Sequence, residues 1–168
     1  TGDLGALAND VGFLPTSAYC GRIRGDFLHL TALVCGSRLG RSWIRPGGVE
    51  FDLDQSRLAQ LEERLEQALH DVTNAVELLW NTSSVRSRFE NTGSITRQVC
   101  LDLGMVGVPA RACGLERDIR QEYPFGLYRF AHVPVSTYPT GNVFGRAYVR
   151  WLEIQRSLAF VEEQLDAL

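Results

Sequence analysis

The sequence predicts a mainly α-helical protein, a bundle of long helices with one small β hairpin. Two long segments carry this prediction, because apolar residues recur every three or four positions along residues 54–80 and again from about 142 to 168. Between short apolar pieces, Pro46-Gly47-Gly48 is a strong turn signal and indicates the hairpin. The 168 residues suit a single domain, and 45% apolar residues can form a real core.

The first third of the chain predicts two helices before the hairpin. Residues 3–14 place apolar side chains at helical spacing, and Pro15 is expected to end that helix. A second helix is expected to start at Thr16 or Ser17, either of which can cap it, and to end near Gly36 or Gly40. Its apolar face consists of Cys20, Ile23, Phe27, Leu30 and Val34.

The helix of residues 54–80 has the clearest pattern. It carries a single apolar stripe with charged residues on its other faces, and Asp52 or Asp54 can cap its start. Its length of about seven turns is typical of a bundle helix. The stripe consists of Leu58, Leu61, Leu65, Leu69, Val72, Val76 and Leu79.

Less regular elements are expected between the two longest helices. Residues 81–94 break the helical pattern, and a short helix is expected from Ile95 to Leu103 with Ser94 as its cap. Residues 128–135 alternate and predict a strand, which Pro134 would confine to an edge or an end. The last helix is expected to begin near Asn142 and to continue to the final residue without a cap.

Composition argues against several classes of function. The net charge of −3 gives no electrostatic support for nucleic-acid binding. The longest apolar run is too short to span a bilayer. All 17 basic residues are arginine, which fits biased codon usage and also fits bidentate recognition of carboxylates or anionic cofactors. The missing initial Met and the uncapped last helix indicate a piece of a longer polypeptide.

No catalytic or metal-ligating residue is predicted from the motifs. The four cysteines show no C-x-x-C spacing, so they are interpreted as buried thiols of a reducing compartment. His29 and His70 lie on predicted helices without a ligand-spaced partner, and no Ser-His-Asp arrangement is present. The glycines of residues 104–114 do not follow the dinucleotide-binding pattern. The cysteines are Cys20, Cys35, Cys100 and Cys113.

Two segments remain as candidate functional surfaces. In one, Arg45 precedes the turn of Pro46, Gly47 and Gly48, where proline fixes φ and glycines allow another backbone to come close. In the other, Arg111, Asp118 and Arg120 follow a glycine-broken turn and can make charge-assisted hydrogen bonds. An ordinary surface turn and a solvated charged loop are the alternative interpretations.

These segments resemble the catalytic large subunits of complex I-related, membrane-bound nickel–iron hydrogenases of the formate hydrogenlyase type. They also resemble the homologous large quinone-site core subunit of respiratory NADH:quinone oxidoreductase. The asparagine in ALANDVGF is closer to the hydrogenase branch. Four stretches carry the resemblance: DLGALANDVGF at 3–13, IRPGGV at 44–49, NTGSITRQVCLDLGMVGVPARACGLERDIRQEYPF at 91–125 and VPVSTYPTGNVFGRAYVRWLEIQRSL at 133–158.

The sequence also departs from the family pattern. Cys113 stands where the family usually has serine, Val99 near its alanine, and Asn142 where it often has aspartate. The nickel-binding cysteine pairs of the family lie near the two ends of the full subunit, and neither pair occurs here. The resemblance therefore predicts that residues 1–168 form one central domain of a larger subunit and hold no cofactor of their own.

The resemblance implies a nickel–iron-hydrogenase-like large-subunit fold and a place in a membrane-associated complex. Its expected partners are an iron–sulfur small subunit with a 4Fe–4S cluster and further subunits, with nickel–iron possible elsewhere in the parent. The expected location is cytoplasmic, on the inner face of the membrane. Arg111, Asp118 and Arg120 are expected to form one hydrogen-bonded knot, with Arg45 aimed at the same interface, and Arg150 is expected to pair with Glu153.

Three functions stay open at this point. The parent reaction is expected to be hydrogen evolution or oxidation coupled to iron–sulfur electron transfer. The alternatives are an NADH:quinone oxidoreductase-like core subunit without nickel and a non-catalytic helical interaction module. Paired C-x-x-C motifs at both ends of the full-length sequence would favour the hydrogenase. The isolated fragment is expected to be inactive in all three cases.

Overall fold

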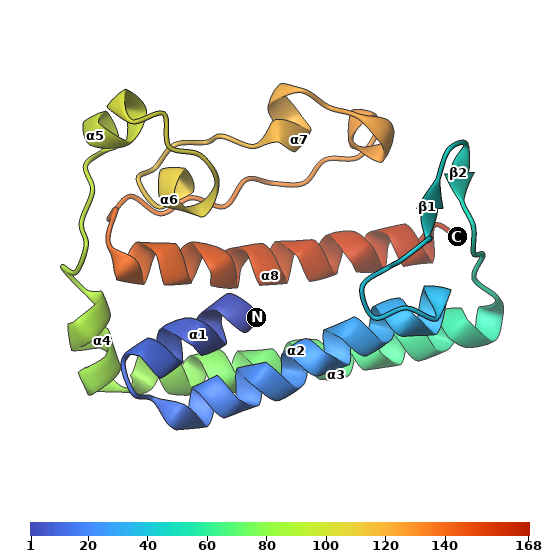
Figure 1. Ribbon diagram of the computed structural model, residues 1–168, viewed down its shortest axis with the longest axis horizontal. Coiled ribbons are helices and arrows are strands. Elements are labelled where there is room, and N and C mark those ends of the chain that lie inside the picture. Colours follow the sequence, from blue (N-terminus) through green and yellow to red (C-terminus); the bar gives the residue numbers. More distant parts are fainter.

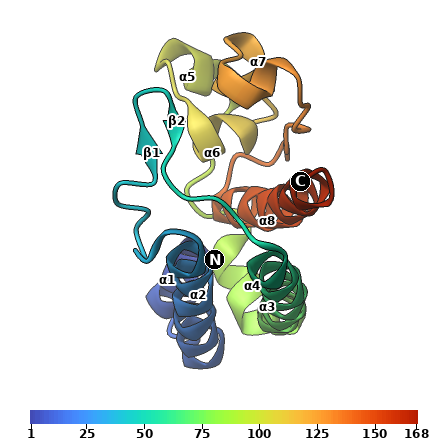
Figure 2. The same ribbon diagram turned by 90° about the vertical axis from the view of Figure 1, so that its right-hand side faces the viewer.

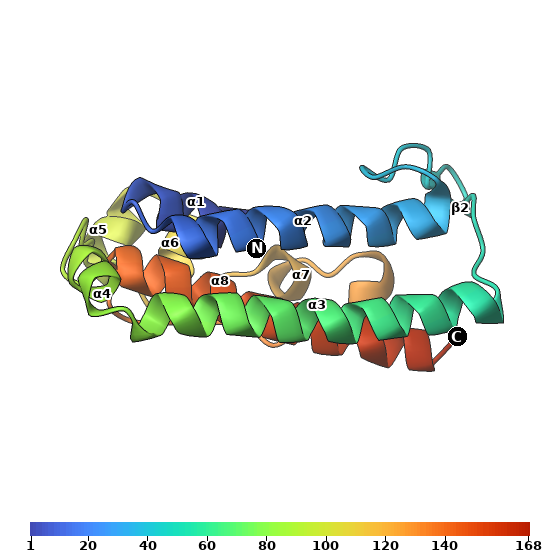
Figure 3. The ribbon, with the colours of Figure 1, turned by 90° about the horizontal axis from the view of Figure 1, so that it is seen from below.

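Three long helices run side by side in the computed structural model, which describes all of residues 1–168 (Figures 1 and 3). They are α2 (Leu14–Cys35), α3 (Gln55–Asn81) and α8 (Val143–Asp166), and α1 (Gly2–Asp10) packs between α2 and α8. The remaining elements are β1 (Ile44–Arg45), β2 (Gly48–Val49), α4 (Ser83–Phe89), α5 (Arg97–Asp102), α6 (Gly107–Arg111), α7 (Ile119–Glu122) and a 3-10 helix, η1 (Gly126–Arg129). The predicted fold class, mainly α with one hairpin, is confirmed. No helix combines the length and the apolar character that crossing a membrane requires.

The junction of α1 and α2 differs from the prediction. Gly12, with φ of +73°, turns the chain before α2 begins. Pro15 does not end a helix but lies in the first turn of α2. Its lack of a backbone N–H costs no hydrogen bond there, because N–H groups of the first turn have no acceptor within the helix. Thr16 is not a cap either, because its hydroxyl donates to the Ala75 carbonyl of α3 at 3.0 Å. The end of α2 is as expected, at a left-handed Gly36.

The hairpin and α3 follow the prediction closely. β1 and β2 are antiparallel, with Ile44 opposite Val49. The Asp54 carboxylate caps α3 by accepting the Arg57 N–H at 2.8 Å. Most of the α3 stripe is buried, which confirms that this face is a core face rather than an exposed one.

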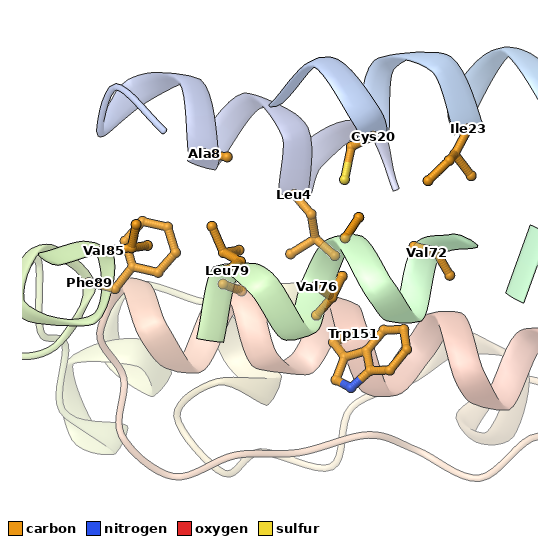
Figure 4. Packing of buried hydrophobic residues seen from close by; sticks show 12 residues of the cluster. Leu4, Ala8, Cys20, Ile23, Val72, Val76, Leu79, Val85, Phe89 and Trp151 are labelled. Atoms are coloured by element: carbon orange, nitrogen blue, oxygen red, sulfur yellow. The ribbon is translucent and has the colours of Figure 1, made fainter. Parts of the chain in front are cut away.

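The main core lies where α1, α2, α3, α4 and α8 meet (Figure 4). In that view Phe89 and Val85 of α4 close one end, and Trp151 of α8 lies beneath Val76. A second cluster continues the core along α2, α3 and α8 with Leu30, Val34, Leu61, Leu65, Leu158 and Leu165. The helices α2, α3 and α8 each contribute to both clusters, so the core extends along all three long helices. The main cluster consists of Leu4, Ala8, Cys20, Ile23, Val72, Ala75, Val76, Leu79, Val85, Phe89, Ala147 and Trp151.

The short elements between α3 and α6 differ from the prediction. Residues 83–89 form α4 instead of an irregular break, because burial of Val85 and Phe89 in the main core stabilises one short helix there. The predicted helix of residues 95–103 shortens to α5. Its cap is Thr96, whose hydroxyl oxygen accepts the Val99 N–H at 3.2 Å, and not Ser94.

The predicted strand of residues 128–135 is wrong. This segment begins in η1 and continues without regular secondary structure, and β1 and β2 form the single sheet. The alternating residues have no neighbouring strand with which to form hydrogen bonds. Instead Arg156 of α8 donates to the carbonyls of Pro134 and Val135 and, at 3.0 Å, to the Ser136 hydroxyl. An arginine side chain thus replaces a sheet partner for these carbonyls.

Candidate subunit interface

Short helices and loops cover the side of α8 that faces away from α2 and α3 (Figures 1 and 2). This part of the chain, residues 91–141, is called the loop layer here, and it includes α5, α6, α7 and η1. The hairpin projects to the same side of the molecule as the loop layer. Both segments that the sequence singled out therefore lie on one side.

Most of the exposed large apolar side chains lie in the loop layer and around the hairpin. Phe130 and Ile44 are the most exposed of them, at 89% and 83%. Soluble monomers rarely expose a large gathering of apolar side chains, so this side has the character of a contact surface. The loop layer contributes Val99, Leu101, Leu103, Val106, Ile119, Tyr123, Phe125, Leu127 and Phe130, and the hairpin region contributes Leu39, Ile44 and Val49.

Asp118 and Arg120 form a compact pair at the start of α7. The Asp118 carboxylate accepts the Arg120 backbone N–H at 3.0 Å and its guanidinium nitrogens at 2.9 and 2.6 Å. The Asp118 side chain is only 7% exposed, and the Arg120 guanidinium lies over the Tyr128 ring, 5.8 Å from its centroid. The guanidinium hydrogen bonds of Arg120 lower the pKa of Asp118, aided by the Arg120 N–H and by the charges of Arg120 and Arg111.

This lowered pKa gives a pH-dependent contribution to stability. The ionised Asp118 stabilises the fold above the unfolded-state pKa of about 3.9, and the contribution is lost as the pH falls through the lower, folded-state pKa. We expect Asp118→Asn to reduce the free energy of unfolding fully at about pH 7 and progressively less below about pH 4. Urea denaturation across this range measures the difference.

Asp102→Asn is the control, because that exposed carboxylate accepts from Gln98 and has no arginine partner. It should show a much smaller difference at every pH. A loss in Asp118→Asn that stayed constant from neutral pH into strong acid would contradict the role of the ionised carboxylate.

Arg111 does not join this pair. Its Nε donates to Glu153 of α8 at 2.7 Å, its Nη2 lies 2.5 Å from the same oxygen, and its Nη1 donates to the Arg117 carbonyl at 3.1 Å. The expected knot of Arg111, Asp118 and Arg120 is therefore two separate interactions. The charge of Arg111 still acts on Asp118, but its hydrogen bonds fasten the loop layer to α8.

The expected pair of Arg150 and Glu153 is wrong. Arg150 Nε donates to Asp3 of α1 at 2.8 Å, whereas Glu153 accepts from Arg111. Both residues lie on α8, but Arg150 binds α1 and Glu153 binds the loop layer. Helical spacing alone allows the pair, and the tertiary partners of each residue prevent it.

Arg45 lies at the exposed end of the hairpin. Its Nε is 3.2 Å from the Glu50 carboxylate and 3.4 Å from the Ser42 carbonyl oxygen, and its side chain is 52% exposed. Gly47 and Gly48 have φ of +97° and +148°, and a Cβ built on either would meet nothing within 4 Å. Pro46, Gly47 and Gly48 thus form an open tip, and no hydrogen bond or ion pair joins Arg45 to the loop layer.

Gly141 has a structural role that the sequence reasoning missed. Its carbonyl accepts the Ile95 N–H at 3.1 Å, and its N–H donates to the Ala112 carbonyl at 2.6 Å. With φ of +64°, a Cβ at this position would overlap the Ile95 carbonyl oxygen. Arg146 donates to the same Gly141 carbonyl at 2.9 Å. The sequence held a cue to this role, because Gly141 lies in VPVSTYPTGN, residues 133–142, which belongs to one of the four stretches that carry the family resemblance.

The side chains of this chain do not fit a metal centre. No three His, Cys, Asp or Glu side chains gather in a way that could hold a metal ion. The four cysteines are free and buried.

The sequence is similar to subunits of respiratory enzymes. Residues 10–168 match the family described as respiratory-chain NADH dehydrogenase, 49 Kd subunit. The chain is 32% identical to NADH-quinone oxidoreductase subunit 4 of Thermus thermophilus, over 98% of this chain and 40% of that protein. It is 30% identical to an NADH-quinone oxidoreductase subunit of Salinispora tropica, over 96% of this chain and 36% of that protein.

A solved structure shares the fold. A chain of the membrane-bound sulfane sulfur reductase, an archaeal respiratory membrane complex, superposes with a TM-score of 0.87 over 98% of this chain and 44% of that chain. Its sequence identity of 24% shows the likeness of fold only. The present chain spans about two fifths of the length of the curated relatives that it matches. Because the family match covers almost all of the sequence, the chain belongs to the family of the 49 kDa subunit of respiratory-chain NADH dehydrogenase.

Proposed function

We propose that this chain is the central region of the large subunit of an NADH:quinone oxidoreductase-type complex, where the loop layer and the hairpin dock an iron–sulfur subunit. The observation that carries the proposal is the concentration of exposed apolar side chains in the loop layer and the hairpin region. These two segments lie on the same side of the molecule, away from α2 and α3 (Figure 2). Arg45 and Arg120 belong to them with partly exposed side chains, and Arg111 lies beneath them beside Glu153. The opposite side of α8 is occupied by the chain's own core. The free side is thus the one left for a partner.

The family match favours the quinone-reducing parent over the hydrogen-converting one. The relatives described above are named as NADH-quinone oxidoreductase subunits, and none of them is named a hydrogenase. The hydrogenase activity that the sequence suggested stays a prediction. Paired C-x-x-C motifs in the full-length sequence, together with hydrogen evolution by the intact complex, would restore it. A location on the inner face of the membrane, reached through partner subunits, is part of the same proposal.

The arginines of this surface would act mainly by positioning. Arg111 is paired with Glu153, Arg120 with Asp118 and Arg45 with Glu50, so each cation has a carboxylate close by. Each arginine and its carboxylate would act on an iron–sulfur cluster of the partner as a dipole, whose electrostatic effect is weaker than that of an unpaired positive charge. Their main effect is then to hold the loops in a fixed shape against the partner, with a smaller effect on the cluster's potential.

The test is assembly of the intact parent complex with a disrupted apolar surface. We expect the double variant Val106→Asp with Phe130→Asp to lower co-purification of the iron–sulfur subunit at least about tenfold, because charges buried at an interface are costly. Both side chains are exposed in this chain, at 69% and 89%, so the fold itself should survive. Circular dichroism of the variant checks that it does.

Leu78→Asp is the matched control. Leu78 is also an exposed apolar residue, at 48%, but it lies on α3, away from the loop layer. It should leave the yield of the iron–sulfur subunit unchanged. Normal assembly of the double variant, or equal loss in both variants, would count against docking through this side.

A further inference from the structure

Positive charge is concentrated in the two segments that form the candidate interface. The loop layer and residues 37–51, which include the hairpin, together contain eight arginines and five carboxylates. The rest of the chain contains nine arginines and fifteen carboxylates. The candidate interface is therefore positive on a chain whose net charge is −3. Because surfaces that associate carry complementary potentials, a surface that docks here should be acidic.

Five arginines of these segments have no carboxylate partner within the chain. Arg45, Arg111 and Arg120 each belong to an ion pair, whereas these five are exposed and belong to none. An exposed guanidinium that is not paired keeps its charge and its donors free for a partner. The five are Arg38, Arg41, Arg97, Arg117 and Arg129.

Arg129 differs from the other four because it lines a cavity of the loop layer. This cavity, called the loop-layer cavity here, has a volume of about 420 Å³ and lies between α7 and residues 128–133. Arg120, Arg129 and His132 line it together with apolar side chains, and no carboxylate does. Within the chain, the Arg129 Nε donates to the Pro124 carbonyl oxygen at a long distance of 3.4 Å.

The cavity between α2 and α3 offers a comparison. It also contains arginines, but two carboxylates line it as well, and Arg22 forms an ion pair with each of them, Asp26 and Asp71. Its positive charge is thus compensated within the chain. In the loop-layer cavity the charge of Arg129 is left uncompensated, so this cavity is suited to an anionic group from outside.

We propose that the loop-layer cavity receives the carboxylate of an aspartate or glutamate of the iron–sulfur subunit, which pairs with Arg129. This inference rests on the docking proposed above and names the chemistry of the docked surface. The Tyr128 and Phe130 side chains border the same cavity. A partner that covers these rings excludes water from the ion pair, and a charge-assisted hydrogen bond is stronger where water is excluded.

The absence of lysine from residues 1–168 allows a direct test of the contact. Arg129→Lys keeps the positive charge and adds a primary amine, which a carbodiimide joins to a carboxylate that touches it. We expect carbodiimide treatment of the intact parent complex to link residue 129 to an aspartate or glutamate of the iron–sulfur subunit, as located by mass spectrometry. Arg64→Lys is the matched control, because Arg64 is exposed on α3, and it should give no such link.

Charge reversal measures how much the contact contributes to assembly. We expect Arg129→Glu to lower co-purification of the iron–sulfur subunit at least about tenfold, because like charges would then meet across the interface. Arg129→Gln should cause a smaller loss and make the yield less sensitive to salt, since it removes a charge without reversing it. Arg64→Glu, the control on α3, should leave the yield unchanged.

The outcomes separate this inference from the docking on which it rests. If Val106→Asp with Phe130→Asp lost the iron–sulfur subunit and Arg129→Glu kept it, the docking would stand and the acidic contact would be overturned. If both variants kept it, both proposals would be overturned. A missing link from residue 129 to the iron–sulfur subunit would also contradict the contact. Weaker binding of Arg129→Glu to phosphatidylglycerol vesicles, with normal assembly, would assign the cavity to a lipid headgroup instead.

Discussion

Gly141→Ala is expected to destabilise the chain by about 3–4 kcal/mol. A left-handed φ of +64° costs an alanine about 1–2 kcal/mol, and the new Cβ would overlap the Ile95 carbonyl oxygen. The backbone has to move, which weakens the hydrogen bonds from Ile95 and to Ala112 at about 1 kcal/mol each. Chemical denaturation monitored by circular dichroism measures the loss.

Gly104→Ala isolates the contribution of the close contact. Gly104 has nearly the same φ, +62°, but a Cβ built there meets nothing within 4 Å. It should therefore lose only the conformational part, about 1–2 kcal/mol. If the two alanine variants lost equal stability, crowding at Gly141 would have no energetic consequence.

Phe89→Ala is expected to cost about 3–5 kcal/mol of unfolding free energy. Phe89 is 1% exposed and is the largest fully buried side chain of the structure. It lies at the end of the main core with Val85, where α4 packs against α3 and α8 (Figure 4). Because α4 is too short to be stable alone, loss of this ring should also unfold α4 itself. Hydrogen exchange of the α4 amides follows that part of the effect.

Phe130→Ala provides the comparison for the same residue type. Phe130 is 89% exposed in the loop layer, so its removal should change stability by less than about 0.5 kcal/mol. A large loss at Phe130, or a negligible one at Phe89, would mean that burial in this fold does not set the cost of removing a phenylalanine.

The long elements could be predicted because their signals are local. The α3 stripe, the Asp54 cap and the Pro46-Gly47-Gly48 turn each lie within one continuous segment of the chain, and the structure confirms all three. By contrast α4 depends on burial of Val85 and Phe89 against helices that are distant in sequence. The alternation of residues 128–135 predicted a strand, but a strand needs a partner, and Arg156 occupies that place.

The candidate interface shows the same difference between local interactions, which the sequence indicates, and long-range ones, which it does not. The Asp118–Arg120 pair joins residues two positions apart, and the sequence stretch already suggested it. The partner of Arg111 is Glu153, 42 residues away, and no local pattern indicates that choice. The sequence therefore predicted which residues carry the charges, and only the packed fold shows how they combine.

Arginines also divide the loop layer into separate spans. Arg146 fixes Gly93 and Gly141, the pair of Arg111 and Glu153 fixes the middle, and Arg156 fixes residues 134–136. Between these fixed points the backbone forms no sheet ladder whose register an inserted residue would disturb. Lengthening one span between these contacts adds only a small loop-closure entropy. The layer is consequently a suitable place to graft a peptide or to vary loop length without redesigning the helices underneath.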